Sequence, residues 1–359
     1  MTSRLKKLFF GIVGLLGAAF LAFVVWPEKA YVAHEVSPNF RAQALAFNIP
    51  ALPDDWEGHK LTAADGTQIY WGQTANRDTA NATYIMVPGY TASMSMQGEQ
   101  VTMLRARGYH VVGMDLRGQG RSERHRAEHP EKMWVDDFST YADDVRLLIE
   151  ALELPNEHPV ILSGSSFGGA VVTRAIGDFD LDVDALFVLA PAYRSQTAPL
   201  SIGMVKGWAN IMRTLGKSNH FMVQQDVWKP LVKDLTQPSS CSSYPPRLHV
   251  GAALFVRDPA QRVGGATNQF AGEIIENGEI VSEPDYTAKM TLPITMIAAE
   301  NDMMIDSPHT EGICKKGFPN CKLVKIPGTG HCLTKENDRV LNTIWGEVDA
   351  LLERVRITP

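Results

Sequence analysis

With 359 residues and 45% hydrophobic side chains, the chain can bury one large core, and it carries no internal repeat. Its formal net charge of -6, with no basic run after the first seven residues, argues against a nucleic-acid partner. No cysteine pair or histidine cluster has the spacing of a zinc site and no glycine-rich phosphate loop stands out, so neither a metal nor a cofactor is expected.

The beginning of the chain has the features of a membrane-spanning segment. Arg4, Lys6 and Lys7 precede an uncharged run over residues 8–26, which at about 1.5 Å per residue spans roughly a bilayer core. A signal peptide shares these features, but the run is long for one and no Ala-x-Ala site follows it; a core helix is a third interpretation. We expect residues 1–30 to form an N-terminal membrane anchor or signal segment, with the rest of the chain outside the cytoplasm, in a periplasm or an equivalent lumen.

Strand-like and helix-like segments then alternate through the first half of the chain. Residues 56–74 alternate around Asp65-Gly66, which predicts a β-hairpin. The segments after it are predicted to be a strand over 82–87, a helix over 94–107, a strand over 109–114, a helix over 136–152 that begins at Asp136-Asp137, a strand over 159–162, a helix over 169–176 and a strand over 185–189. Such alternation predicts a mostly parallel sheet with helices on both faces and a ligand site at the carboxyl ends of the strands.

The pentapeptide Gly164-Ser165-Ser166-Phe167-Gly168 lies between one of these strands and the next helix. A sharp strand-to-helix turn holds a serine hydroxyl clear of the backbone, and it needs small neighbours, here Gly164 and Gly168. Taken alone, the pentapeptide is also compatible with a glycine-rich turn that has no function. The strand before it and the helix after it favour a nucleophile elbow in which Ser166 is the nucleophile and Ser165 stands at the wrong spacing.

The alternation of strands and helices stops between residues 191 and 292. An insertion at this place, between the elbow half and the last strands, would lie over the ligand site. We therefore expect residues 193–290 to be a cap or lid, inserted into an α/β core that residues 31–192 and 291–359 form together.

The predicted cap is rich in Met and aromatic side chains. Most of them are expected to pack within the cap, although adaptable side chains of this kind also suit an acyl-chain tunnel. They include Met204, Trp208, Ile211, Met212, Leu215, Phe221, Met222, Val227, Trp228, Leu231 and Leu235. Residues 237–247 are predicted to be a loop, and residues 262–269 a loop or the start of a helix after Gly265.

An acidic turn follows the next predicted strand, residues 292–299. A nucleophile elbow requires an acid after a strand downstream, and Asp302 occupies the turn past this strand. Asp306 and Glu300 are the alternatives for this role, and the non-catalytic interpretation of Asp302 is that it caps the turn.

A histidine follows the last predicted strand, residues 321–326. It ends the run Pro327-Gly328-Thr329-Gly330-His331, and none of the other nine among the ten histidines comes after a strand at this place in the order. The glycines leave His331 free to reach the elbow. We predict a triad in which His331 takes the proton of Ser166 while Asp302 orients the imidazole.

The oxyanion formed by attack on an acyl carbonyl needs two N–H donors. One should be the amide of Phe167, directly after the nucleophile, and the other should come from the loop after the strand over 82–87. That strand ends in Pro88-Gly89-Tyr90, where Pro88 has no N–H. We predict the Tyr90 amide as the second donor, with Gly89 as the alternative; an ordinary Pro-Gly turn fits the dipeptide equally well.

These motifs together resemble the α/β-hydrolase fold and, within it, the lysophospholipase and monoacylglycerol lipase branch. Residues 115–122, read as DLRGQGRS, are similar to the branch's D-x-R-G-x-G-x-S segment, and residues 330–339, GHCLTKENDR, to its C-terminal Gly-His and the helix start after it. The resemblance covers residues 56–355 apart from much of the middle insertion. One departure is Pro88-Gly89 where the family usually has His-Gly, and it bears on the branch more than on catalysis, because the donor is a backbone amide.

The resemblance implies a serine hydrolase that acts on acyl esters, such as lysophospholipids or monoacylglycerols. A small-ester carboxylesterase, a peptidase or a carbon–carbon hydrolase would use the same triad, and a non-catalytic binding protein of the same fold is a further alternative. The expected partners are a small acyl-ester or lipid substrate and, through the N-terminal segment, a membrane; the oligomeric state is not indicated. The four cysteines permit two bridges in an oxidising compartment, in a pairing that spacing does not reveal.

Overall fold

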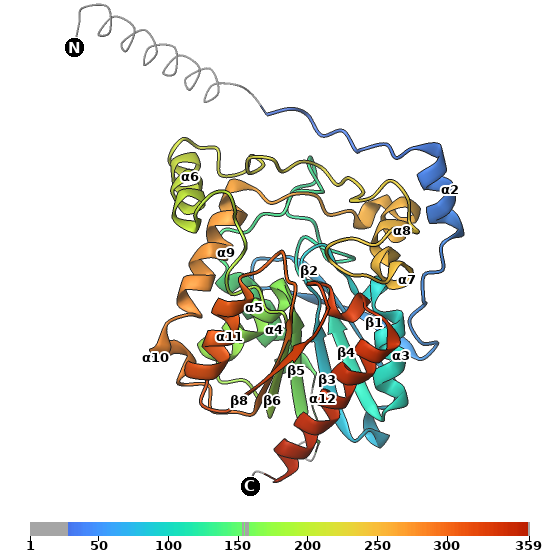
Figure 1. Ribbon diagram of the computed structural model, residues 1–359, viewed down its shortest axis with the longest axis vertical. Coiled ribbons are helices and arrows are strands. Elements are labelled where there is room, and N and C mark those ends of the chain that lie inside the picture. The colour runs from blue at the N-terminus through green and yellow to red at the C-terminus, as the bar shows by residue number, and fades with distance from the viewer. Residues whose placement is uncertain (1–27, 153, 155–157, 358–359) are drawn as a thin grey trace, which may run out of the picture.

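The computed structural model describes residues 28–152, 154 and 158–357 of the chain. One eight-stranded sheet runs through this part, with helices on both of its faces (Figure 1). Within the sheet β1 and β2 form an antiparallel hairpin, β2 is also antiparallel to β4, and the neighbouring strands beyond β4 are parallel. Its order is β1-β2-β4-β3-β5-β6-β7-β8, and the strands are β1 (Trp56–Thr62), β2 (Gln68–Thr74), β3 (Ala82–Val87), β4 (Tyr109–Met114), β5 (Val160–Ser165), β6 (Ala185–Leu189), β7 (Ile294–Ala299) and β8 (Cys321–Ile326). The predicted mostly parallel sheet and its hairpin are confirmed.

The central strands are buried on both faces, and alternate residues of each strand enter two separate apolar clusters. In β5, Val160 and Leu162 belong to one cluster, whereas Ile161 belongs to the other. This division follows from the period of two along a strand, which sends successive side chains to opposite faces. Since both faces bury side chains, β5 is an apolar run before its last residues, and this made it recognisable.

Helices cover each of the two faces. The face of Ile161 packs against α3 and α12, and the face of Leu162 packs against α4, α5 and α11. In α12 the buried side chains from Val340 to Leu352 recur at three- and four-residue intervals, which lines one side of the helix with apolar groups. The bounds are α3 (Gly98–Ala106), α4 (Ser139–Ala151), α5 (Phe167–Asp178), α11 (Ser307–Lys316) and α12 (Asp338–Ile357), with short 3-10 helices η1 (Arg77–Thr79), η2 (Met94–Met96), η3 (Pro259–Gln261) and η4 (Leu333–Lys335).

The chain between β6 and β7, all of it described, adds no strand to the sheet. It contains α6 (Ile202–Thr214), α7 (Pro245–Leu248), α8 (Val250–Arg257), α9 (Asn268–Ile280) and α10 (Pro284–Thr287). Contacts to the loops after β3 and β8 hold it at the carboxyl ends of the strands: the Tyr90 hydroxyl donates to the Gly264 carbonyl at 2.6 Å, and a disulfide joins Cys241 to Cys332. At the same end, α2 (Pro38–Ala46) packs on α8 (Figure 1). We call residues 193–290 the cap segment; its boundaries stay a prediction.

Two helices begin later than predicted. The helix expected from residue 94 is divided, because Gln97 has φ -106° and ψ 13°, outside the α-helical range, and it separates η2 from α3. The helix expected from Asp136 begins at Ser139. The Asp137 carboxylate lies before the helix and accepts the Ser139 N–H at 2.8 Å, so Asp137 stands outside α4 and satisfies a backbone donor at its N-terminus.

Inside the cap segment, the uncertain stretch over 262–269 is extended or loop up to Thr267. The Thr267 hydroxyl accepts the Phe270 N–H at 3.2 Å and caps α9, so the helix that we considered after Gly265 exists and begins at Asn268. The loop predicted over 237–247 is present, except that its last residues enter α7.

No helix in the described parts of the chain is both long enough and apolar enough to cross a membrane. The run over residues 8–26, from which a membrane anchor or a signal segment is predicted, lies outside the described residues.

Candidate active site

Ser166 lies on a sharp turn between β5 and α5. Its backbone angles, φ 52° and ψ -116°, are ones that side-chain-bearing residues rarely adopt, and a residue held in this way costs on the order of 1–3 kcal/mol. The Ser166 N–H donates to the Leu189 carbonyl at 2.8 Å, which holds the turn against β6. A Cβ at Gly164 would lie 2.3 Å from the Gly168 oxygen, and one at Gly168 would lie 2.2 Å from the Val87 oxygen. The predicted small neighbours are therefore required by the packing of the turn.

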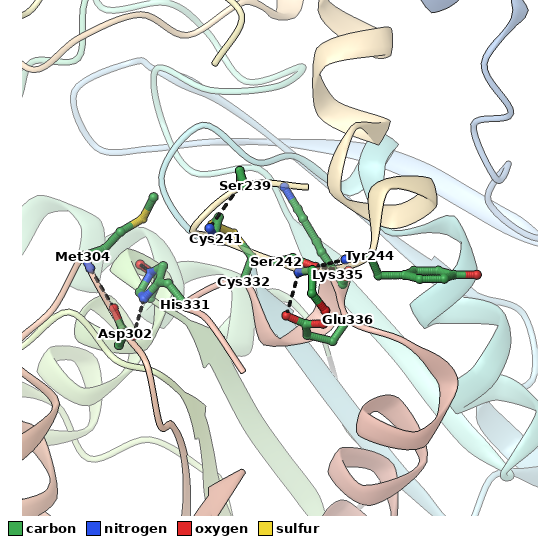
Figure 2. The surroundings of a disulfide bond; sticks show 12 residues. Ser239, Cys241, Ser242, Tyr244, Asp302, Met304, His331, Cys332, Lys335 and Glu336 are labelled. Carbon is green, nitrogen blue, oxygen red and sulfur yellow. Dashed lines mark hydrogen bonds and ion pairs between the residues drawn. A yellow bond between two sulfur atoms is a disulfide. The ribbon is translucent and has the colours of Figure 1, made fainter. Parts of the chain in front are cut away.

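The structure brings the three predicted residues of the triad together from three strand ends. His331, in the loop after β8, has its Nε2 2.7 Å from Ser166 Oγ and its Nδ1 2.7 Å from Asp302 Oδ2. One tautomer satisfies both contacts: Nδ1–H donates to the carboxylate, and Nε2 accepts the serine hydroxyl. Figure 2 shows Asp302 and His331 side by side, next to the disulfide of Cys332.

The Asp302 carboxylate is fully buried and is satisfied by several donors. Its Oδ1 accepts the N–H of Met304 at 2.8 Å and of Ile305 at 3.0 Å, and its Oδ2 accepts His331. Burial by itself would raise the pKa of Asp302, but the bond and charge of His331 and the two backbone donors outweigh it and hold the pKa below its usual value. An ionised carboxylate is therefore stable beside the imidazole.

The two alternative acids are occupied elsewhere. Asp306 caps α11 by accepting the His309 N–H at 3.2 Å and pairs with Arg194 at 3.3 Å. Glu300 accepts the Gly328 N–H at 2.9 Å. Neither residue makes a hydrogen bond with His331 within the part of the chain that the structure describes.

The loop predicted to hold the oxyanion lies against the elbow. A Cβ at Gly89 would stand only 3.3 Å from the Ser166 Cβ, so the backbone of this loop passes directly beside the nucleophile. Phe167 is the first residue of α5, and its N–H, like that of Tyr90, donates to no acceptor among the described residues. Two free amides of this kind could both donate to an oxyanion beside Ser166.

The sequence analysis did not predict one buried residue that contacts the loop after β3. Gln119, completely buried, accepts the Thr91 N–H through its Oε1 at 2.5 Å and lies with its Nε2 3.5 Å from the Gly89 carbonyl. It occupies a variable position of the D-x-R-G-x-G-x-S segment, so the motif draws no attention to it. Asp115, at the start of the motif, accepts the N–H groups of Met94 and Arg121.

Two disulfides join the four cysteines. Cys241 of the cap segment pairs with Cys332, which directly follows His331, across 91 residues of chain (Figure 2). Cys314 of α11 pairs with Cys321, the first residue of β8, across 7 residues. The first bridge therefore reaches the loop of the predicted base, and the second lies at the opposite end of β8.

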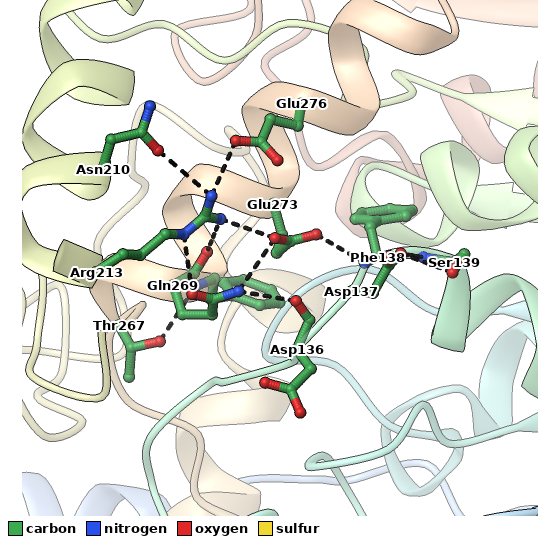
Figure 3. Close-up of polar contacts among 11 residues, drawn as sticks. Asp136, Asp137, Phe138, Ser139, Asn210, Arg213, Thr267, Gln269, Glu273 and Glu276 are labelled. Carbon is green, nitrogen blue, oxygen red and sulfur yellow. Dashed lines mark hydrogen bonds and ion pairs between the residues drawn. The ribbon is translucent and has the colours of Figure 1, made fainter. Parts of the chain in front are cut away.

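A polar network fastens the cap segment to the core (Figure 3). From α6, Arg213 donates to Glu273 at 2.8 Å, to Glu276 at 3.0 Å and to Gln269 at 2.9 Å, all on α9. The second oxygen of Glu273 accepts the Phe138 N–H at 2.9 Å, just before α4. Burial raises the pKa of Glu273, although the Phe138 N–H and the Arg213 charge oppose the rise.

The apolar side chains of the cap segment divide into two groups. Met212 and Leu235 are buried, as expected for cap packing, whereas Met204, Ile211 and Leu231 are exposed. A cavity of about 760 Å³ touches only Leu235 of this set and no residue of the predicted triad; its lining is Gln43, Ala46, Phe47, Asn48, Pro50, Glu99, Leu235, Thr236, Tyr244, Pro245, Pro246 and Arg247. No group of three or more His, Cys, Asp or Glu among the described residues is arranged to hold a metal ion.

The sheet topology and the strand–turn–helix at Ser166 together define an α/β-hydrolase fold. Residues 78–338 match the family described as serine aminopeptidase, S33, and the chain belongs to that family. The predicted resemblance is thereby confirmed, and the protein is a hydrolase of a family to which esterases and lipases belong.

Two relatives align with most of the chain. The "Probable lysophospholipase L2" of Haemophilus influenzae is 23% identical over 321 residues, covering 88% of this chain and 97% of its own. The "AB hydrolase superfamily protein YisY" of Bacillus subtilis is 32% identical over 275 residues, covering 72% and 88%. Among solved structures, a soluble variant of monoglyceride lipase from Saccharomyces cerevisiae, in complex with a substrate analog, superposes with a TM-score of 0.64 at 15% identity, covering 84% and 96%.

Proposed function

We propose that the chain is a serine hydrolase that cleaves carboxylic esters through an acyl-enzyme. The observation that carries the proposal is the pair of 2.7 Å contacts from His331, one to the Ser166 hydroxyl and one to the buried Asp302 carboxylate. A serine hydroxyl is a weak nucleophile until a positioned base takes its proton, and a base needs a third group to fix its tautomer. The proposed roles are therefore nucleophile for Ser166, general base for His331 and orienting acid for Asp302.

The proposed reaction has two halves. Ser166 Oγ attacks the acyl carbon while its proton passes to His331 Nε2; the tetrahedral oxyanion accepts the N–H groups of Phe167 and Tyr90. The ester C–O bond then breaks, and the leaving alcohol takes the proton from Nε2. In the second half water attacks the acyl-enzyme with His331 again as base, and the carboxylic acid leaves as Ser166 regains its proton.

We propose lipid-derived acyl esters, such as lysophospholipids or monoacylglycerols, as the substrate class. Two features support it. The cap segment contacts the loops after β3 and β8, which flank Ser166. A relative and a structural neighbour carry the names lysophospholipase and monoglyceride lipase. Two other substrate classes compete with this proposal. They are peptides, because the family is described as serine aminopeptidase, and small esters, because carboxylesterases share the fold.

A substrate panel on the purified full chain tests this proposal. It should contain p-nitrophenyl esters from acetate to palmitate, a monoacylglycerol, a lysophosphatidylcholine and an aminoacyl-p-nitroanilide, with Ser166→Ala as the control. Because each buried methylene contributes up to about 0.8 kcal/mol, kcat/KM should rise by up to about tenfold per two carbons until the acyl site is full. Best turnover of acetate with both lipids uncleaved would replace the lipid substrate with a small ester, and cleavage of the anilide alone would replace it with a peptide.

A further inference from the structure

The loop that carries His331 is covered by a segment of the cap, residues 239–247, which we call the strap. Cys332, directly after His331, forms a disulfide with Cys241 of the strap, with their Cα atoms 5.0 Å apart. The Cys332 N–H also donates to the Cys241 carbonyl at 2.8 Å. Figure 2 shows the strap lying along this loop, with Asp302 and His331 at one end.

The contacts continue on the far side of Cys332. The Ser242 hydroxyl donates to the Lys335 carbonyl at 2.7 Å, and the Ser243 hydroxyl donates to Glu336 at 2.9 Å. Glu336 is 1% exposed, and its carbonyl accepts Arg247 at 2.7 Å. One covalent bond and a series of hydrogen bonds thus hold the loop along most of the strap.

The strap also closes the space before His331. A Cβ at Gly330 would lie 2.4 Å from the Ser240 oxygen, so the two backbones are in direct contact there. The earlier part of the loop is held by the sheet end instead, where the Asn301 N–H donates to the Thr329 carbonyl at 2.9 Å. His331 therefore lies at the point where support by the sheet gives way to support by the strap.

We infer that the strap, through the Cys241–Cys332 disulfide, is a positioning device that holds the catalytic base against its nucleophile. This inference rests on the proposed function, because it gives His331 the role of the base. A displacement of about 1 Å at a reacting group can lower a rate by about a hundredfold. The 2.7 Å contact between His331 and Ser166 is thus a distance that a loosened loop would lose. The strap acts through His331 and touches no reacting atom.

The second disulfide provides a matched control. The full chain with Cys241→Ser and Cys332→Ser is compared with the full chain carrying Cys314→Ser and Cys321→Ser, which loses a bridge at the other end of β8. On p-nitrophenyl butyrate below both melting temperatures, kcat of the strap variant should fall about ten- to a hundredfold with KM within threefold. Labelling by a fluorophosphonate should slow by a similar factor. The control should stay within twofold of the parent, and equal kcat in the two variants would overturn the inference.

Reversibility separates positioning from stabilisation. In the control variant the strap disulfide is the remaining bridge, so dithiothreitol converts it to two thiols while becoming a cyclic disulfide itself. The kcat should drop to that of the strap variant and return on reoxidation, with alkylation and intact mass reporting the thiol count. A lowered Tm with unchanged kcat would assign the bridge a purely structural role. Alkylation of both Cys241 and Cys332 in the untreated parent would also overturn the inference.

Failure of the inference and failure of the proposed function have different signatures. A parent chain that neither hydrolyses the panel nor labels with the probe removes the proposed function and this inference with it. A parent that is active, a Ser166→Ala variant that is not, and a strap variant with full kcat remove this inference alone. Should the strap variant fail to fold, the folded control variant is reduced below its melting temperature instead, because this opens the strap disulfide after folding. A ten- to hundredfold lower kcat is then expected, and an unchanged kcat with both thiols alkylated contradicts the inference.

Discussion

The strand ends and the cap segment are built in different ways. At the strand ends, Ser166 and Asp302 follow β5 and β7, whose residues are buried on both faces, so the sheet fixes their backbone. His331 follows β8, a partly exposed edge strand, and its loop is held by the strap as well. In the cap segment, α6 and α9 meet through the Arg213 network, and apolar side chains such as Met204 remain exposed. The backbone is therefore held most firmly where the proposed chemistry takes place, whereas the part of the cap segment outside the strap should tolerate more change in sequence.

Removal of the nucleophile is the largest effect that this comparison predicts. Ser166→Ala should lower kcat by a factor of about 10⁴ or more and abolish fluorophosphonate labelling, because the triad acts as a unit. Ser165→Ala, one residue away on β5, is the matched control and should retain hydrolysis and labelling. An active Ser166→Ala variant beside an inactive Ser165→Ala variant would move the nucleophile to the neighbouring residue.

Next in size is the effect of the acid. Asp302→Asn keeps the shape of the side chain but favours the wrong imidazole tautomer, and kcat should fall by about 10³–10⁴. Asp306→Asn is matched to it, because Asn caps a helix as well as Asp does and the pair with Arg194 is partly exposed. Its kcat should stay within twofold of the parent. Steady-state kinetics on one soluble ester decides between them; a damaging Asp306→Asn would transfer the role to Asp306.

The strand ends were largely predictable from the sequence. The predicted bounds 82–87, 109–114, 185–189 and 321–326 equal those of β3, β4, β6 and β8. The buried strands β3, β4 and β6 are short apolar runs, whereas β8 is a partly exposed edge strand that includes Lys322 and Lys325. The strand–turn–helix context also selected Ser166, because the turn leaves room only for glycines two residues before and after it. Local patterns suffice where one element alone determines the geometry.

The cap segment was much less predictable, for two physical reasons. α9 buries polar residues such as Asn277 and Glu273, so its helical face carries no apolar period that a sequence pattern could reveal. The pairing of Cys241 with Cys332 and the support that Gln119 gives to Thr91 depend on contacts between distant parts of the chain. Such contacts exist only after the sheet has brought the loops together.

Glycines provide a comparison of packing in the two regions. Gly168→Ala would place a Cβ 2.2 Å from the Val87 oxygen, and we expect it to destabilise the protein by about 1–3 kcal/mol or more, with loss of activity. Gly207, within α6, has open space around it, so Gly207→Ala should stabilise by about 0.5–1 kcal/mol through the unfolded chain. Urea unfolding measures both. A Gly168→Ala variant as stable as the parent would mean that the elbow is less crowded than its geometry requires.

The smallest predicted effect is a difference in the pH dependence of stability. The pKa of Asp302 is lowered in the folded chain despite its burial, so its stabilising contribution is present above the unfolded value near 3.9 and is lost as pH falls through the lower folded pKa. Burial raises the pKa of Glu273, which gives the opposite sign: its contribution is present below the unfolded value near 4.3 and is lost as pH rises through the folded pKa.

The free energy of unfolding should therefore depend on pH with opposite signs through the two carboxyl groups. We expect the unfolding free energy of the parent relative to Asp302→Asn to increase as pH rises from about 3 to 5, and that relative to Glu273→Gln to decrease from about pH 4 upward. The opposite sign of the two changes is the expected result. Urea unfolding of the three proteins across this pH range measures it. Parallel slopes would show that the Arg213 network compensates the burial of Glu273 as fully as His331 and the backbone donors compensate that of Asp302.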